Sequence, residues 1–296
     1  MRGVVAAVLT PMREDLSIDR AAFAAHCRRL LDAGCHGLGI FGTTGEANSL
    51  SVGERIDACA WLVEDGIPAA RLLPGTGACA LPDAVRLTRA ALELGTAGVL
   101  ALPPFYYKGV SDDGLLRYFA ELIERVGDDR LRLFLYHIPP MAQVGFTLEL
   151  IGRLLDAYPG TIAGTKDSSG DPERIEAVCT AFPRLTVFAG SERFLLDTLR
   201  WGGDGCISAT VNVLARRARA VYDLHAAGRA DEAEAEQAQL TAERAFLDGF
   251  PAIPALKALV RDATGEDGWL NLRPPLDPLD AARARELAGR VYSSTP

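Results

Sequence analysis

Lysine is scarce in this chain, and several patterns that indicate common functions are missing. Only Lys108, Lys166 and Lys257 are lysines among 31 basic residues, and the chain has four histidines. No H-x-x-x-H or H-E-x-x-H spacing and no Cys/His cluster occurs, so the sequence predicts no metal site. No G-x-x-x-x-G-K-[ST] loop is present and no G-x-G-x-x-G follows an expected strand, so nothing predicts a nucleotide or other cofactor.

Positive charge is also in deficit. The 296 residues include 39 acidic against 31 basic side chains, and the net charge of −8 argues against nucleic acid or an anionic membrane as a partner. Six cysteines are scattered without a C-x-x-C pair, so we expect reduced thiols and a cytoplasmic location. Residues 1–11 are apolar but too short for a signal peptide or a membrane span.

Short apolar runs alternate with amphipathic segments up to about residue 225. Strands are expected at 3–10, 37–41, 71–76, 97–102, 131–137, 161–166, 185–190 and 204–209. Helices are expected at 19–33, 51–65, 82–94, 113–126, 147–158, 172–182, 192–201 and 213–227. Continuous apolar strands between helices indicate a parallel α/β sheet that is covered on both faces. Eight such units favour a closed (β/α)8 TIM barrel over an open doubly wound sheet.

The segment after about residue 225 shows no strand signal and no low-complexity linker. It is expected to form two or three further helices. We therefore predict one domain, in which residues 1–225 form the barrel with the catalytic site and residues 226–296 form a C-terminal helical extension.

Functional residues of such a barrel lie where its strands run into the following loops. Polar residues and glycines gather at these positions: Gly42 to Glu46, Gly75 to Gly77, Pro103 to Lys108, Tyr136 to Pro139, Lys166 to Gly170, Gly190 to Glu192 and Ser208 to Thr210. The glycines of the run 42–46 allow backbone N–H groups to approach a small anion, although such turns also cap helices in many proteins. Packing alone does not explain so many polar loop starts on one rim.

Lys166 follows the apolar run 161–165 and precedes the turn 167–170. Because burial disfavours the ammonium form of lysine, an amine in such a place can attack a carbonyl and form a Schiff base. Arginine, which this chain uses nearly everywhere else, stays charged and cannot form an imine. The alternative is a solvated lysine at a strand end.

Tyrosines near this lysine are candidates for proton transfer. Tyr136 lies near the end of the strand 131–137 and is either a core tyrosine or a hydroxyl relay for imine formation. Tyr106 and Tyr107, in a proline-containing loop, either extend that relay or form a subunit contact. His137 is expected near the rim, in an orienting or structural role.

Four motifs together resemble the dihydrodipicolinate synthase / N-acetylneuraminate lyase family. They are the runs 42–46 (Gly-Thr-Thr-Gly-Glu), 104–107 (Pro-Phe-Tyr-Tyr), 135–139 (Leu-Tyr-His-Ile-Pro) and 164–170 (Gly-Thr-Lys-Asp-Ser-Ser-Gly), in family order. The resemblance extends from about residue 4 to at least residue 212. It implies a TIM barrel with C-terminal helices, usually a tetramer built from dimers, that binds pyruvate or another 2-oxo acid as a Schiff base without metal or cofactor.

The resemblance also implies roles for individual residues. Lys166 matches the Schiff-base lysine and Tyr136 the proton-transfer tyrosine. The threonine pair, which holds the keto-acid carboxylate and completes the relay, is matched by Thr43 and Thr44. Tyr106 matches the tyrosine donated by a neighbouring subunit, with Tyr107 left open as its alternative. Pocket-lining positions are matched by Gly42, Gly190 and Ile207.

One motif departs from the synthases of the lysine pathway, which resemble Tyr-Asn-x-Pro-x-Arg at strand five. Met141 stands here at the position of the arginine, which grips the carboxylate of the second substrate. A thioether cannot form the bidentate pair that a guanidinium forms, and the loss of such a pair weakens recognition by about 1.5–3 kcal/mol. Met141 and His137 therefore predict a second-substrate pocket that is less anionic than the synthase's.

We expect a class I lyase that acts on pyruvate or a related 2-oxo acid, by aldol cleavage or condensation or by dehydration of a deoxy sugar acid. Its partners are expected to be this small-molecule substrate and further copies of the chain, in a homodimer or homotetramer. One alternative is dihydrodipicolinate synthase itself, with a carboxylate grip from elsewhere. Another is a barrel that binds keto acids without turnover.

Overall fold

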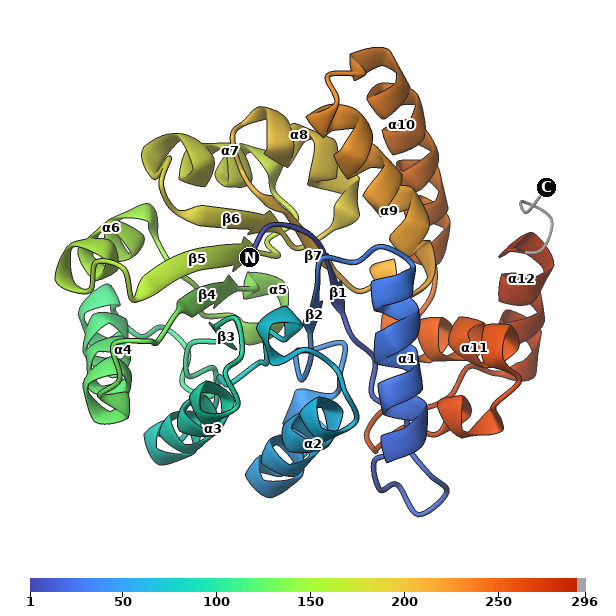
Figure 1. The fold of residues 1–296 in the computed structure, drawn as a ribbon, viewed down its shortest axis with the longest axis horizontal. Coiled ribbons are helices and arrows are strands. Elements are labelled where there is room, and N and C mark those ends of the chain that lie inside the picture. Colours follow the sequence, from blue (N-terminus) through green and yellow to red (C-terminus); the bar gives the residue numbers. More distant parts are fainter. Residues whose placement is uncertain (292–296) are drawn as a thin grey trace.

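Parallel strands form a curved sheet at the centre of the computed structural model, which describes residues 1–291 (Figure 1). The seven strands are β1 (Gly3–Ala7), β2 (Gly37–Gly39), β3 (Val99–Ala101), β4 (Leu133–His137), β5 (Ile162–Asp167), β6 (Thr186–Ala189) and β7 (Gly205–Ser208). They are hydrogen-bonded in the order β2-β1-β7-β6-β5-β4-β3, and every pair is parallel. The predicted parallel arrangement is thus confirmed.

One of the eight predicted strands, the third at 71–76, is present only as isolated bridges. Leu72 bridges Leu38 of β2, and Gly75 bridges Leu100 of β3, both in parallel. Pro74 interrupts the ladder because proline has no N–H to donate. The segment nevertheless fills the space between β2 and β3, since Leu73 N donates to Leu38 O at 2.9 Å. The (β/α)8 barrel is therefore nearly closed, with one strand reduced.

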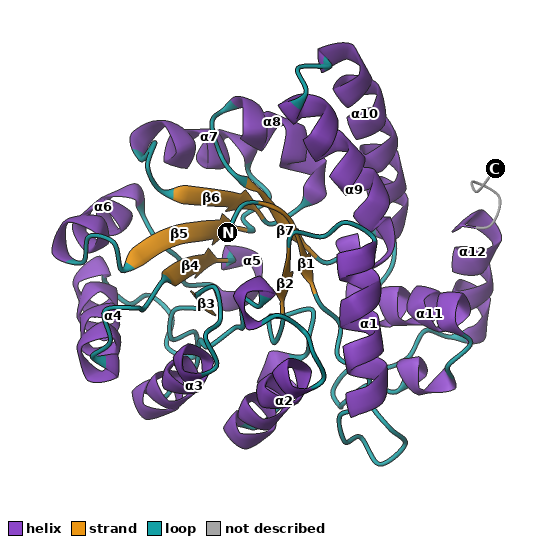
Figure 2. Cartoon of the chain, in the orientation of Figure 1, coloured by secondary structure: helices purple, strands orange, loops and turns teal. Residues whose placement is uncertain are grey.

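Helices surround the strands on the outside (Figure 2). They are α1 (Arg20–Asp32), α2 (Val52–Glu64), α3 (Leu81–Glu93), α4 (Asp112–Val126), α6 (Leu148–Ala157), α7 (Pro172–Ala181), α8 (Leu195–Arg200) and α9 (Val211–Ala226). The short α5 (Pro139–Ala142) instead directly follows the end of β4. Their starts follow from local sequence: Ser51 and Glu54 form a capping box on α2, and the Asp171 side chain caps α7.

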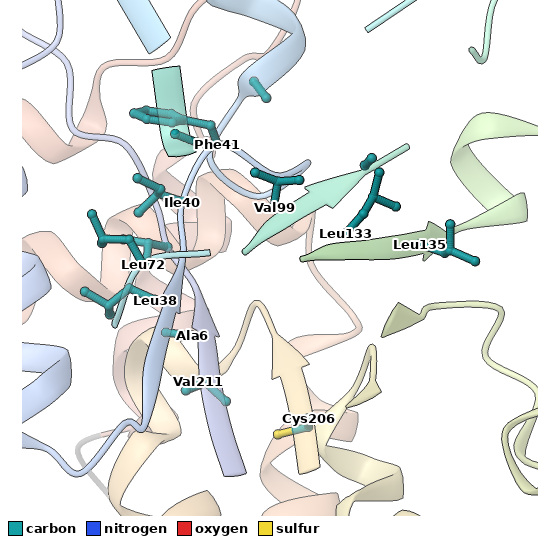
Figure 3. Packing of buried hydrophobic residues seen from close by; sticks show 14 of the residues in the cluster. Ala6, Leu38, Ile40, Phe41, Leu72, Val99, Leu133, Leu135, Cys206 and Val211 are labelled. Carbon is teal, nitrogen blue, oxygen red and sulfur yellow. The ribbon is translucent and has the colours of Figure 1, made fainter. Parts of the chain in front are cut away.

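Apolar side chains alternate between two sides of the strands, as expected for a barrel. Those that point inward form a cluster of Val5, Ala7, Leu73, Leu100, Phe134, Tyr136, Phe188 and Ile207. The larger cluster lies between strands and helices, and Figure 3 shows Leu38, Leu72 and Leu135 on this outer side. The inner cluster matters for function because it surrounds the polar groups described below.

The C-terminal part forms helices α10 (Ala230–Leu247), α11 (Ala252–Thr264) and α12 (Ala281–Val291). Figure 1 shows α11 outside the barrel, beside α1 and α9. Leu256 of α11 and Trp269, which lies between α11 and α12, belong to a further apolar cluster with Leu9, which follows β1. The division of the chain near residue 225 stays a prediction. No helix of residues 1–291 is long and apolar enough to cross a membrane.

A buried histidine links α1 to α9. His26 Nε2 lies 2.8 Å from Asn212 Oδ1, and the Asn212 amide donates to Ala7 O at 2.7 Å. Arg29 Nη2 lies 2.7 Å from His26 Nδ1, so the neutral ring carries its proton on Nε2. Burial lowers the pKa of His26 from 6.5 to about 3.

This shift in the pKa of His26 predicts that the folded protein is less stable in acid. The folded state binds fewer protons than the unfolded state between pH 6.5 and about 3, so the free energy of unfolding falls as the pH falls through this window. For His26 alone the loss from pH 7 to pH 5 is about 2 kcal/mol. Urea unfolding at both pH values should show a smaller loss for His26→Gln than for wild type. Equal losses would contradict the assignment.

Candidate active site

An irregularity in β5 turns Lys166 into the barrel. β4 and β5 pair Leu133 with Ile162 but Phe134 with Gly164, so one residue, Ala163, is skipped. Strict alternation from Ile162, whose side chain lies in the outer cluster, would turn Lys166 outward as well. The extra residue reverses this parity, as β-bulges do. Lys166 consequently stands opposite two inward-facing neighbours, Tyr136 on β4 and Phe188 on β6.

Lys166 and Tyr136 meet inside the barrel near the carboxyl ends of the strands. The Lys166 Nζ donates to the Tyr136 hydroxyl at 3.3 Å and lies 4.3 Å from the centre of its ring. The two residues are only 4% and 3% exposed. Among residues 1–291 no carboxylate forms an ion pair with Lys166, whereas the other buried lysine, Lys257, is paired with Glu46. The amine of Lys166 thus faces a phenol and not a counter-ion.

A threonine turn completes the group. Thr43 Oγ1 lies 3.3 Å from the Tyr136 hydroxyl, so three polar groups, from Thr43 through Tyr136 to Lys166, form a continuous chain. The turn is closed by the N–H groups of Gly45 and Ala47, which donate to Gly42 O. Space is open beside Gly42, where an added Cβ would meet no atom within 4 Å. Thr44 is half-buried in the same turn.

Ile207 and Gly190 are placed differently. Ile207 on β7 is fully buried in the inner cluster, with Tyr136 and Phe188. Gly190 follows β6 and packs against the loop after β5, since an added Cβ would lie 2.0 Å from Ser168 Oγ. The structure thus gives Ile207 a place on the inner wall and Gly190 a role in close packing of two rim loops.

His137 is not brought together with Lys166. It is the next residue after Tyr136 and therefore points to the outer side of β4. Its Nδ1 accepts from Phe146 N at 3.0 Å, and an added Cβ on Gly145 would lie 2.5 Å from its ring. Burial lowers the pKa of His137 to about 4, with Arg174 acting in the same direction. This placement fits the orienting or structural role expected for His137, and its contact with substrate stays a prediction.

Tyr106 and Met141 lie on the rim, away from this chain of hydrogen bonds. Tyr106 is 74% exposed, Tyr107 is 73% exposed, and their rings contact each other edge to face at 5.4 Å. Met141, on α5, is 66% exposed. Lys108 Nζ ties their two segments together by donating to Ala142 O at 2.8 Å. Within one chain, therefore, these side chains do not contact Lys166 or Tyr136.

Sequence reasoning missed two sets of contacts behind the site. Asp167, directly after Lys166, accepts from Arg174 Nε at 2.9 Å on the outer side of β5. Glu46, the last residue of the motif 42–46, forms a buried ion pair with Lys257 of α11. The scarcity of lysine was a usable signal for Lys257, but nothing in the sequence indicated its partner.

A TIM barrel with a buried lysine and tyrosine in contact near the carboxyl ends of its strands is typical of class I lyases, which bind carbonyl substrates as Schiff bases. Comparison with known proteins agrees. The chain belongs to the dihydrodipicolinate synthetase family, whose sequence model matches residues 1–292. It is thus a Schiff-base-forming lyase that acts on pyruvate or a related 2-oxo acid.

Several relatives are similar over nearly the whole chain. An uncharacterized DapA-like lyase of Chloroflexus aurantiacus is 36% identical over 99% of this chain and 98% of its own length. N-acetylneuraminate lyase of Rhizobium meliloti is 31% identical over 99% of this chain and 96% of its own. The crystal structure of dihydrodipicolinate synthase from Agrobacterium tumefaciens superposes with a TM-score of 0.90 at 33% identity, covering 99% of both chains.

Proposed function

We propose that Lys166 is the nucleophile of this lyase. Its amine attacks the ketone carbon of a 2-oxo acid, and Tyr136 carries protons to the ketone oxygen. The net step consumes one proton, joins nitrogen to carbon as an iminium and releases the oxygen as water. Thr44 and nearby backbone N–H groups hold the carboxylate of the acid, other than the N–H groups of Gly45 and Glu46, which close the turn.

The iminium then serves as an electron sink. In aldol cleavage the bond between C3 and C4 breaks, its electron pair moves into an enamine, and the C4 hydroxyl loses a proton to become an aldehyde. In dehydration a proton leaves C3 and the C4 hydroxyl leaves as water. Tyr136 and Thr43 are the groups placed to move these protons, because they form a continuous chain to Lys166.

The contact between Lys166 Nζ and the Tyr136 hydroxyl carries this proposal. Sodium borohydride reduces an iminium to a stable secondary amine, so treatment of the folded protein in the presence of pyruvate should add one pyruvate-derived group. Peptide mass spectrometry should place the group on Lys166. If no simple 2-oxo acid gives an adduct on folded protein, the proposal is wrong.

We propose that the second substrate is an aldehyde without the carboxylate that aspartate semialdehyde carries. Met141 is largely exposed and offers no positive charge for a second carboxylate. Pyruvate should therefore condense with aldehydes that carry no carboxylate faster than with aspartate semialdehyde, measured on one panel of aldehydes. A coupled assay with aspartate semialdehyde tests the synthase alternative directly, and efficient turnover there would overturn this assignment.

We also propose that the active form is a homodimer or homotetramer in which Tyr106 enters the site of a neighbouring chain. The exposed pair of Tyr106 and Tyr107 supports this, since such aromatic side chains are enriched in interfaces. Tyr106→Phe should lower kcat about 10- to 100-fold, because a proton-transfer hydroxyl is lost. Tyr107→Phe is the matched control and should stay near wild type. A monomer in sedimentation, or two unaffected variants, would contradict the proposal.

A cytoplasmic location fits the cysteines. All six are unpaired, and five of them are buried. Burial raises the pKa of Cys35 and of Cys59 to about 12, so these thiols are unreactive packing groups. We propose the cytoplasm on this ground, because its reducing conditions keep such thiols free.

A further inference from the structure

The turn that carries Thr43 and Thr44 is held from outside the barrel. Glu46 ends this turn in the left-handed region, with φ of 57°, and its N–H donates to Thr43 O at 3.1 Å. Its carboxylate is fully buried. One oxygen forms an ion pair with Lys257 of α11, and the other accepts from Arg273 N at 3.1 Å. Every charged or N–H partner of this carboxylate among residues 1–291 thus comes from the C-terminal part of the chain.

The same C-terminal segment grips the neighbouring loop. Lys257 Nζ also donates to Asn271 O at 2.8 Å, and the Asn271 side chain donates to Met12 O at 3.0 Å. The Arg273 guanidinium donates to two further backbone carbonyls, those of Leu16 at 2.8 Å and Ser49 at 2.7 Å. Residues 257–273 therefore connect the loop after β1 with the loop after β2.

A buried ion pair is a poor device for stability alone. Removing two charges from water costs about as much as their attraction returns, and well-packed apolar residues often replace such pairs without loss. Burial lowers the pKa of Lys257, and the attraction of Glu46 only opposes that shift. The pair is better explained by its effect on the position of the turn 42–46, because Thr43 Oγ1 must stay within hydrogen-bond distance of the Tyr136 hydroxyl.

We propose that Glu46 and Lys257 are positioning residues, which hold the Thr43–Thr44 turn against Tyr136 and thereby make the C-terminal helices part of the catalytic apparatus. This rests on the proposed function of Lys166 and Tyr136. Misplacement of a catalytic group by about 1 Å costs on the order of 100-fold in rate. The pair therefore acts on proton transfer and on carboxylate binding together.

The test is a double variant, Glu46→Gln with Lys257→Met, which removes both charges and leaves neither buried alone. We expect a folded protein, with circular dichroism like that of wild type. Its kcat should fall about 10- to 100-fold and its KM for pyruvate should rise, while borohydride still traps pyruvate on Lys166. If the double variant does not fold, Glu46→Asp, which keeps the charge but shortens the side chain by one methylene, is measured in the same way.

Arg217→Met is the matched control. Arg217 joins α9 to α10 through half-buried ion pairs with Glu236 at 2.7 Å and Glu243 at 3.1 Å, and it does not contact the turn. It should lose a similar amount of thermal stability but keep its kcat and KM. A folded Glu46 variant with wild-type kcat and KM would overturn the inference. A decrease of kcat in Arg217→Met as large as that in the Glu46 variant would overturn it as well. Failure of wild type to trap pyruvate would instead reject the proposed function.

Discussion

Lys166→Arg is expected to abolish borohydride trapping and to lower turnover by about 1,000-fold or more, the scale on which loss of a covalent nucleophile acts in other enzymes. Arginine keeps a positive charge and a similar length, but its guanidinium does not form an imine. Within residues 1–291 no carboxylate pairs with this buried position beside Tyr136, so the variant also tests whether the site tolerates a fixed charge. Initial rates with the preferred aldehyde and the mass of the trapped protein measure both effects.

Lys108→Arg is the control for this experiment. Lys108 is exposed on the rim and donates to Ala142 O, so its replacement should leave trapping on Lys166 unchanged. A barrel that binds keto acids without turnover makes the opposite prediction. In that case Lys166→Arg would bind pyruvate with unchanged affinity, and wild-type protein would form no adduct.

The barrel could be predicted from the sequence because its determinants are local. Apolar runs of strand length alternate with capped amphipathic helices, and the capping box of Ser51 with Glu54 is present as predicted. The predicted strand at residues 71–76 was the exception. Their apolar character indicated a full strand, but Pro74 leaves only bridges to β2 and β3.

The direction of Lys166 could not be predicted in the same way. Its position on the rim followed from topology, but its inward orientation depends on the bulge at Ala163. That bulge is tertiary in origin: an added Cβ on Gly164 would lie 2.4 Å from the ring of Phe134. The pattern of residues along β5 does not reveal a contact with a ring on β4, so the bulge could not be predicted from it.

Contacts between residues far apart in the sequence could not be predicted either. Glu46 belongs to a motif that the sequence singled out, yet its contacts with Lys257 and Arg273 join segments more than 200 residues apart. The direction of His137, away from Lys166, has a simpler cause. It neighbours Tyr136 in sequence, and neighbours in a strand face opposite sides.

Tyr136→Phe is expected to lower kcat about 100- to 10,000-fold, the usual contribution of a general acid–base group. Phenylalanine fills the same space in the inner cluster, so the fold should persist. The adduct on Lys166 should still form with pyruvate, because the amine keeps its place. It should form more slowly, because the hydroxyl that carries the proton is lost. Tyr158→Phe is the control: its hydroxyl donates to Glu124 at 2.8 Å, outside the barrel, and its loss should not change kcat.

A double-mutant cycle with Thr43 decides whether the two hydroxyls act as one relay. Thr43→Val removes the hydroxyl that lies 3.3 Å from that of Tyr136 and keeps the branched shape. If protons pass through both groups in series, the variant with both changes should be little slower than Tyr136→Phe alone, since the chain is already broken. If the losses multiply, Thr43 acts independently of Tyr136, for example on the substrate carboxylate, and the relay is wrong.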